Sequence, residues 1–391
     1  MQHCIEGIVT LTFSRVAISV ELNKGREGMS TYRVISADSH VVETEDLWRT
    51  YLDKRFQDKA PRLVHQPTRD AWAIEGLGAP VSAGHNRAGT RPEDLGKTFR
   101  FMEGLTGGWD AESRLKDVAR DGIDGEVLYP SSSMHIFRHP DLDFQWACFR
   151  AYNRWLSEFC ASHPDKLKGL ALISLQDIET AVAELGKAKK LGLAGAVIAL
   201  YPDKDKPYSG PMYDPFWAAC QDLEMPLSLH ILTGRGVDLH DLMVDYSIAP
   251  TIVQRTLAVL VFSGVFERFP GLKVVSAEND ISWAADFLQR MDHVYQLHRH
   301  YVPTKLTSGK LPSELFKEHV YCTFQRDLAG AKLAGTIGAG NMLWASDYPH
   351  VDSTWPRSQQ VIAEHTSFLT EQEGRMVFCE NAARLYRFTE E

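Results

Sequence analysis

The sequence predicts an α/β protein, a (β/α)8 or TIM barrel with a long insertion after its first strand. Short apolar runs rich in β-branched residues alternate along the chain with longer segments of helical periodicity. Most of the runs are continuously apolar rather than alternating, which is typical of parallel strands that are covered on both faces. Eight of them are present, and eight strands with intervening helices are what a closed barrel of this class requires.

Each expected strand is a short run of this kind. In chain order they are Val34–Ala37, Gly125–Tyr129, Leu167–Leu175, Gly195–Leu200, Pro226–Ile231, Leu272–Ala277, His319–Phe324 and Met342–Ser346. Helical periodicity is clearest in three of the intervening segments, which are Ile178–Leu191, Trp283–Leu297 and Gln359–Phe368. In the first of these, Ala181, Leu185 and Ala188 share one apolar stripe, as a helix packed on a sheet requires.

The interval between the first two strands is far longer than the others and is rich in Gly, Pro, Arg and Asp. We expect an insertion here, over residues 44–115, on the side of the barrel where sites form. It is either part of the site or a surface subdomain with no catalytic role, and the sequence leaves both open. Residues 1–29 are expected to be an N-terminal extension, with Met29 as a natural start, ahead of a single barrel domain at 30–391.

Composition and charge exclude several classes of protein. The chain has 391 residues, of which 44% are hydrophobic, and this share excludes intrinsic disorder. The net charge of −9 and the lack of a Lys/Arg run argue against nucleic-acid binding. The apolar stretch at 257–264 is too short to cross a membrane. Six irregularly spaced cysteines, with no C-x-x-C, predict reduced thiols and a cytoplasmic protein.

Acidic and histidine side chains follow three of the expected strands. Asp38 and His40 come directly after the first strand, and residues two apart on a strand point the same way. His230 lies at the end of the fifth run, where a buried imidazole needs a partner. Asp347 comes directly after the eighth run. Because the carboxyl ends of barrel strands form one rim, we expect these four side chains to meet.

Two imidazoles and two carboxylates form a mixed nitrogen and oxygen set that suits one divalent metal ion. Zn²⁺ is the expected ion, and Mn²⁺ is the alternative. Such an ion generates hydroxide near neutral pH or polarises a substrate oxygen. One of the carboxylates can then act as a proton carrier.

A resemblance to a known family is carried by the segments ISADSHVVE, DGIDGEVLYPS, PLSLHI, FSGVFERFPGLKVVSAE, CTFQRD, WASDYPHVDSTWP and ENAARLYRF. With these segments in order over residues 30–388, the chain resembles the amidohydrolase-related family that includes aminocarboxymuconate-semialdehyde decarboxylase. The resemblance implies a (β/α)8 barrel with one divalent metal at the carboxyl ends of its strands. It carries the metal ligands onto Asp38, His40, His230 and Asp347, and the role of proton carrier onto Asp347. It also implies a homodimer or a larger homo-oligomer.

The chain departs from the family's pattern at two places. Many relatives open with H-x-H, whereas this chain has Asp38 in place of the first histidine, and an acid there is compatible with metal binding. The family's aromatic-acid decarboxylases carry a histidine in an H-x-G-E pattern after the sixth strand, where this chain reads SAENDISW. Glu278 is the acid adjacent to this strand end, and we expect it to be a base, a metal ligand or a salt-bridged acid.

Other residues near the strand ends are candidates for the site. His350 is expected to touch the substrate or orient the preceding aspartate, or else to be a packed loop histidine. Tyr129 and Ser131 end the second strand and could line the pocket. Arg326 follows the seventh strand, where its guanidinium could bind a substrate carboxylate. His135 is expected to be structural or on the surface.

Several functions remain open. The leading hypothesis is a mononuclear metal-dependent hydrolase of a small, carboxylated or cyclic organic substrate, because the strand-six histidine of the decarboxylases is missing. Its catalytic residues would be Asp347, Glu278 and His350. The alternative is a metal-dependent non-oxidative decarboxylase of an aromatic or enoic acid, and a hydratase is a further possibility. A non-catalytic barrel that binds a metal or a ligand also stays open. The expected partner is a small-molecule substrate, with no nucleic acid and no membrane.

Overall fold

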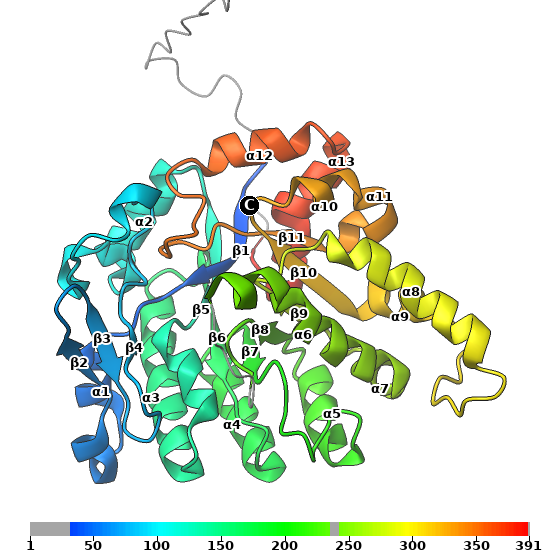
Figure 1. Ribbon diagram of the computed structural model, residues 1–391, viewed down its shortest axis with the longest axis horizontal. Coiled ribbons are helices and arrows are strands. Elements are labelled where there is room, and N and C mark those ends of the chain that lie inside the picture. Colours follow the sequence, from blue (N-terminus) through cyan, green and yellow to red (C-terminus); the bar gives the residue numbers. More distant parts are fainter. Residues whose placement is uncertain (1–31, 235–241, 390–391) are drawn as a thin grey trace, which may run out of the picture. The chain divides into compact units, whose positions relative to one another are not determined.

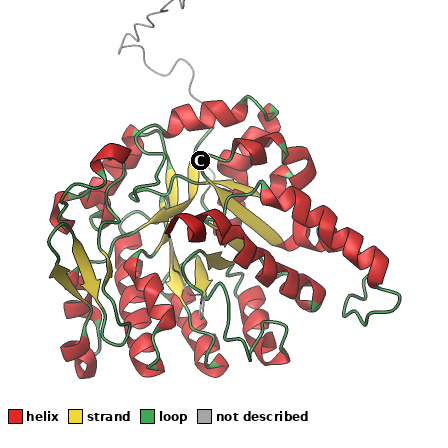
Figure 2. Ribbon diagram, in the orientation of Figure 1, coloured by secondary structure: helices red, strands yellow, loops and turns green. Residues whose placement is uncertain are grey.

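The computed structural model describes residues 32–234 and 242–389. The expected N-terminal extension at 1–29 lies outside these residues. Within them the expected barrel is confirmed, since parallel strands form one eight-stranded sheet at the centre and helices surround it (Figures 1 and 2). In spatial order the strands are β1 (Ile35–His40), β5 (Gly125–Tyr129), β6 (Leu167–Leu172), β7 (Gly195–Ile198), β8 (Leu227–His230), β9 (Val274–Ala277), β10 (Val320–Phe324) and β11 (Met342–Trp344). Every one of them coincides with an expected run.

The residues that follow β11 close the barrel against β1. The backbone N–H of Asp347 donates to the carbonyl of Asp38 at 2.9 Å, and the N–H of His40 donates to the carbonyl of Tyr348 at 2.7 Å. These hydrogen bonds hold Asp347 beside the Asp38–His40 pair. The closure of the barrel therefore assembles one side of the candidate site.

Helices cover the outside of the barrel (Figure 2). They are α2 (Ala111–Arg120), α3 (Leu142–Ala161), α4 (Ile178–Lys190), α5 (Asp214–Asp222), α6 (Leu242–Phe262), α7 (Val265–Arg268), α8 (Trp283–His298), α9 (Pro312–His319), α10 (Leu328–Lys332), α11 (Ala334–Ile337), α12 (Ser358–Thr366), α13 (Glu371–Arg375) and α14 (Asn381–Tyr386). The helices expected from periodicity are α4, α8 and α12. Several begin at an aspartate cap: Asp110, Asp141 and Asp177 each accept a backbone N–H three residues on, which satisfies a donor in the first turn.

The insertion between β1 and β5 forms a small layer of its own. It contains α1 (Glu45–Tyr51) and a three-stranded antiparallel sheet of β2 (Arg62–His65), β3 (Asp70–Ala73) and β4 (Val81–Ser82). Figure 1 shows this sheet beside α1 at one edge of the barrel. The buried carboxylate of Asp70 anchors it, accepting from the Phe101 backbone N–H and the Arg100 guanidinium, each at 2.9 Å.

Short 3-10 helices connect the regular elements. They are η1 (Lys54–Lys59), η2 (Pro92–Asp94), η3 (Phe101–Glu103), η4 (Thr106–Gly108), η5 (Ser132–Arg138), η6 (Pro211–Tyr213) and η7 (Ala339–Asn341), and η8 (Met376–Glu380) is a π-helical turn. None of the described helices is both long enough and apolar enough to span a membrane. The described cysteines are free thiols, and all but Cys379 are buried.

A fully buried ion pair lies beneath the seam between β1 and the residues after β11. Arg114 of α2 and Glu126 of β5 are both 0% exposed, with Nε to Oε2 at 2.6 Å and Nη2 to Oε1 at 2.9 Å. Arg114 also donates to the carbonyls of His40 at 2.7 Å and Tyr348 at 3.3 Å. The guanidinium therefore ties α2 to both chain segments that meet at the seam.

We expect Arg114→Met to lower the free energy of unfolding by about 3–5 kcal/mol, because it leaves the Glu126 carboxylate buried without a partner. The double variant R114M/E126L removes both charges and should recover most of this loss. Urea denaturation of the two variants beside the wild-type protein measures the difference. A double variant no more stable than the single one would show that the unpaired charge is not the cause.

Candidate metal centre

Five ionisable side chains converge at the carboxyl ends of the barrel strands. Asp38 and His40 belong to β1, His230 ends β8, Glu278 directly follows β9, and Asp347 lies three residues beyond β11. His40 Nε2 lies 3.2 Å from Asp347 Oδ1, 3.5 Å from Asp38 Oδ1 and 3.7 Å from Glu278 Oε2. His230 Nε2 lies 3.2 Å from Glu278 Oε2 and 3.8 Å from Asp38 Oδ1. The structure thus brings together all four side chains expected to bind a metal, with Glu278 beside them.

Each imidazole is oriented through its other nitrogen. His40 Nδ1 lies 2.7 Å from the Pro130 carbonyl, and His230 Nδ1 lies 2.7 Å from the Ile231 carbonyl. Because a carbonyl only accepts, both Nδ1 atoms carry a proton, and in the neutral ring each Nε2 keeps its lone pair for a metal. This is the arrangement in which metal-binding histidines are usually held.

The atoms that face one another here lack ordinary partners. Among the described residues, no hydrogen bond reaches Asp38 Oδ1, His40 Nε2, His230 Nε2 or either carboxylate oxygen of Asp347. Unpaired buried polar atoms are costly, and a cation among them would satisfy all five at once. The ligand atoms of Asp38, His40 and His230 lie within 4.8 Å of one another, as do those of His40, Glu278, Asp347 and His350. The two groups share His40, and each of them offers at least three ligands to a divalent ion.

Burial and neighbouring charges shift the pKa values of the side chains in the cluster. Burial, helped by the carboxylates of Glu278 and Asp347, raises the pKa of Asp38 to about 7. Burial opposes charge on His230, but Glu278 and Asp38 outweigh it and raise the pKa of His230 to about 9. Burial and the neighbouring His350 lower the pKa of His40 to about 4. Three buried carboxylates repel one another, and a bound cation would relieve this repulsion.

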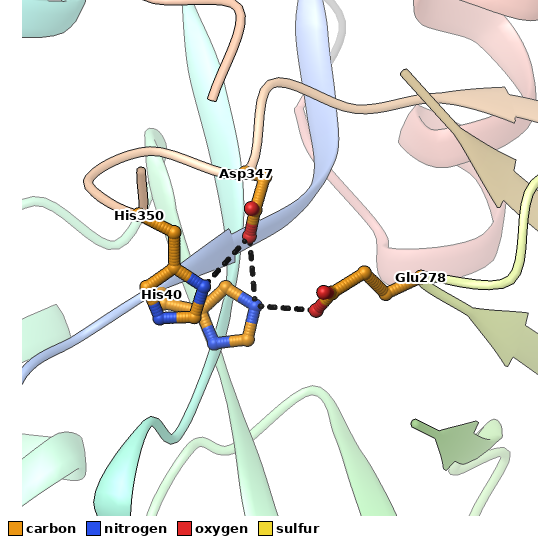
Figure 3. Close-up of side chains that lie close together, drawn as sticks. All are labelled: His40, Glu278, Asp347 and His350. Atoms are coloured by element: carbon orange, nitrogen blue, oxygen red, sulfur yellow. Dashed lines mark ion pairs between the residues drawn. The ribbon is translucent and has the colours of Figure 1, made fainter. Parts of the chain in front are cut away.

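Asp347 and His350 form a distinct pair within the cluster (Figure 3). His350 Nδ1 lies 3.0 Å from Asp347 Oδ1, and the His350 ring stacks on that of His40 with centroids 3.9 Å apart. Against the effect of burial, His350 and His40 hold the pKa of Asp347 well below its usual range, and Asp347 raises the pKa of His350. Asp347 and His350 thus favour each other's charged forms, and His350 Nε2 lies 2.8 Å from the Ser131 hydroxyl.

Two of the acids are held in an unusual backbone conformation. Glu278 has φ of 55° and Asp347 has φ of 60°. A left-handed conformation at a residue other than glycine costs about 1–3 kcal/mol and is concentrated at functional sites. Backbone hydrogen bonds offset this cost. The Asp347 N–H donates to the Asp38 carbonyl of β1, and the Glu278 N–H donates to the Thr323 hydroxyl at 2.9 Å. Both acids are thereby turned toward the histidines, as Figure 3 shows.

A cavity of about 540 Å³ opens above the cluster. Its lining comes from the insertion, the segment after β5, the start of α6 and the segment after β11. The lining residues are Gly84, His85, Thr90, Pro92, Leu95, Ser131, Met134, His135, Leu232, Met243, Tyr246, Glu278, Asp347, His350, Val351 and Asp352. The cavity is thus largely apolar at its walls and ionisable at its floor, as small-molecule sites commonly are.

The residues expected to line the pocket have different positions. Ser131 does line the cavity. Tyr129 is fully buried below the site, where its hydroxyl lies 2.8 Å from that of Ser228 and its ring packs against His230. Arg326 lines a smaller adjoining hollow, and its guanidinium donates to the backbone carbonyls at 352 and 353. The structure therefore does not bring Tyr129 or Arg326 to the cavity above the cluster.

Sequence reasoning missed four residues of the site. The Thr323 hydroxyl donates to Asp38 Oδ2 at 3.0 Å, and the Tyr246 hydroxyl donates to Glu278 Oε1 at 3.1 Å. His85 and His135 line the cavity, although His135 was expected to be structural. Thr323 carried a usable signal, because it lies near the end of a barrel strand. Tyr246, on α6, and His85, in the insertion, carried none.

Comparison with known proteins places the chain in a family. A family model described as amidohydrolase matches residues 65–388. The chain belongs to the amidohydrolase family. The gamma-resorcylate decarboxylase of Rhodococcus jostii (strain RHA1) is 27% identical over 289 residues, which cover 66% of this chain and 85% of that protein.

Solved structures share the fold of this amidohydrolase-family chain. An amidohydrolase from Mycobacterium avium subsp. paratuberculosis K-10 matches with a TM-score of 0.74 and 21% identity, over 91% of this chain and 99% of that one. A dihydroxybenzoic acid decarboxylase from Polaromonas sp. JS666, with bound manganese and the inhibitor 2-nitroresorcinol, matches with a TM-score of 0.61 and 18% identity, over 92% and 98% of the two chains.

The expectation of a hydrolase is wrong, because curated relatives that match this chain are decarboxylases, among them gamma-resorcylate decarboxylases and the decarboxylase orsB of Emericella nidulans. That expectation rested on the missing strand-six histidine. The structure shows Glu278 at that strand end, so an ionisable group still faces the histidines. The absence of that one histidine does not distinguish hydrolysis from decarboxylation. The coarser expectation of a metal-binding enzyme is supported, while zinc and the homo-oligomer stay predictions.

Proposed function

We propose that this chain is a metal-dependent, non-oxidative decarboxylase of a hydroxylated aromatic acid. The observation that carries the proposal is the set of unpartnered buried ligand atoms, one of whose residues, Asp347, lines the cavity. The decarboxylase relatives support the reaction, and the cavity's size and apolar walls support a ring-shaped substrate.

The resident ion is proposed to be Mn²⁺, held by Asp38, His40, His230 and Asp347, with Glu278 beside them. Carboxylate oxygens suit Mn²⁺, and imidazole suits several transition ions. With Glu278 the site has three carboxylates and two imidazoles, which favours Mn²⁺ over an ion that prefers thiolate ligands. The neighbour with bound manganese supports this choice. When bound, a divalent ion polarises the oxygens of a substrate carboxylate and of a hydroxyl next to it.

The proton that replaces the carboxylate is proposed to come from the Asp347–His350 pair. His350 holds the proton, Asp347 lies 3.0 Å away and reaches the cavity floor, and the Ser131 hydroxyl orients the far side of the imidazole. As the carbon–carbon bond to the carboxylate breaks, CO2 leaves and the electron pair stays on the ring carbon. That carbon takes up the proton, so the reaction consumes one proton and no water.

Replacing Glu278 with glutamine is expected to lower kcat about a hundredfold. Glutamine keeps an oxygen for the Tyr246 hydroxyl but removes the negative charge that faces both His40 and His230. Steady-state CO2 release measures the effect, and the surface variant Glu318→Gln, on the helix α9, is the matched control. Wild-type kinetics in E278Q would make Glu278 a structural acid.

The direct test of the proposed reaction is product analysis in D2O. The Mn²⁺-loaded protein is incubated with a panel of ortho-hydroxylated benzoic acids. We expect one CO2 for each acid consumed and one deuterium at the carbon that lost its carboxylate. Consumption of an acid without CO2, or a product that contains oxygen from the solvent, would contradict decarboxylation.

A further inference from the structure

The cavity has a second polar end, made of histidines that the metal centre does not use. Three imidazole rings follow one another outward from the metal centre. The ring centroids of His40 and His350 are 3.9 Å apart, and those of His350 and His85 are 5.4 Å apart. His135 lines the same cavity from η5. His85 comes from the insertion, at residue 85 just after β4, and His135 comes from the segment after β5. Two separate parts of the chain thus place an imidazole at this end.

The hydrogen-bonding state of His135 follows from its neighbour. Arg138 Nη2 contacts His135 Nδ1, and because a guanidinium only donates, Nδ1 must accept. The proton of the neutral ring is then on Nε2, so His135 offers a donor that Arg138 does not compete for. Burial and Arg138 also lower the pKa of His135 to about 4, which keeps the ring uncharged at neutral pH.

His85 is less tightly held. Its Nδ1 lies 3.5 Å from the Ser132 hydroxyl, and no hydrogen bond from the described part of the chain reaches its Nε2. Burial lowers the pKa of His85 well below its usual value, and the neighbouring histidines act in the same direction. This end of the cavity therefore contains two neutral imidazoles, and the Nε2 atom of each can form a hydrogen bond with a ligand.

The charges around the cavity disfavour a second anion on the substrate. Glu278, Asp347 and Asp352 line it, and no lysine or arginine is among the described residues of the lining. Apolar side chains, including Pro92, Leu95 and Met134, also line the cavity. A substrate carboxylate is matched by the metal centre, whereas the cation near the histidine end, Arg138, donates to His135 and is not among the residues that line the cavity.

We propose that His85 and His135 form a subsite that binds an uncharged hydrogen-bonding substituent of the substrate. This substituent, a phenolic hydroxyl or a carbonyl, lies on the edge of the substrate ring away from the reacting carboxylate. This inference rests on the proposed function for the orientation of the substrate. It assigns the insertion a role in substrate choice, because His85 is part of it. The preferred substrate is then a monocarboxylic aromatic acid with a distal hydroxyl.

The test compares substrate preference in the wild-type protein and in His85→Leu. Salicylate is set against its derivatives that carry an added meta or para hydroxyl, or a para carboxylate. We expect the wild-type protein to favour at least one hydroxylated derivative by about ten- to a hundredfold in kcat/KM, and to reject the dicarboxylate. In H85L the preference should fall below about threefold with metal content unchanged, and His85→Gln, which restores a donor, should recover part of it.

His65→Leu is the matched control, because His65 lies in the same insertion, on β2, and its side chain is 74% exposed. If H85L does not fold, His135→Leu carries the same expectation. Unchanged preference in a folded, metal-loaded H85L or H135L would overturn the inference. If no acid is decarboxylated, the proposed function fails, and the same acids become binding probes for calorimetry. Discrimination that is lost in H85L would then still support the subsite, and equal binding of all the acids to the wild-type protein would overturn it.

Discussion

Asp347→Asn is expected to lower kcat for CO2 release by about a thousandfold or more. Asparagine keeps the shape of the side chain and its backbone hydrogen bond to β1. It removes the charge that holds a proton on His350 and that lies 3.2 Å from His40 Nε2. Both the proposed proton transfer and the negative charge around the metal are weakened by one substitution.

Single-turnover measurement of CO2 release, with metal content determined on the same sample, separates these two effects for D347N. The control is Asp286→Asn on the exposed face of α8, which makes the same chemical change away from the barrel mouth. A D347N protein that keeps its metal and works within tenfold of the wild-type rate would remove Asp347 from the proton path.

His230→Ala is expected to abolish turnover mainly through loss of the metal. The variant removes one of two imidazoles whose Nε2 atoms face the carboxylates, and loss of a ligand or its orienting partner commonly weakens binding by ten- to a hundredfold or more. It also leaves Asp38 and Glu278 facing each other without the imidazole between them, so the empty site is further destabilised.

Metal content after gel filtration, and activity as a function of added Mn²⁺, measure this effect in H230A. His163→Ala is the control, since His163 pairs with Glu112 outside the cluster. Partial rescue at high Mn²⁺ concentration would fit a weakened site. Full metal occupancy together with full activity would show that His230 is not a ligand.

The barrel was predictable because its strands are buried on both faces. A continuous apolar run such as Gly195–Ile198, which is buried at every position, is typical of a strand that is covered on both faces. The three strands of the insertion were not predictable by the same rule. β2, with the sequence RLVH, is the partly exposed edge of its sheet and pairs with β3, so its sequence has no strong apolar pattern.

The metal centre was predictable to the extent that its ligands lie at strand ends. His40 and His230 are the last residues of β1 and β8, and parallel strands bring such positions to one rim. The contacts that complete the site come from segments without that constraint. Tyr246 reaches Glu278 from α6, and His85 reaches the cavity from the insertion, and the folding of neither segment follows from local sequence.

The hydrolase expectation failed for a chemical reason. Hydrolysis and decarboxylation can both use a divalent ion among imidazoles and carboxylates, so the ligand set does not separate them. The missing histidine after strand six was one side chain in a cluster of several proton-carrying groups. In the structure Glu278, Asp347 and His350 still surround His40.

The most direct test of the account is a metal titration of the chelator-stripped protein, followed by CO2 release from a hydroxylated benzoic acid. We expect no release from the stripped protein, a rise in proportion to added Mn²⁺, and a plateau at one ion per chain. Undiminished release from the stripped protein, or a plateau that requires several ions per chain, would contradict a single ion held by Asp38, His40, His230 and Asp347.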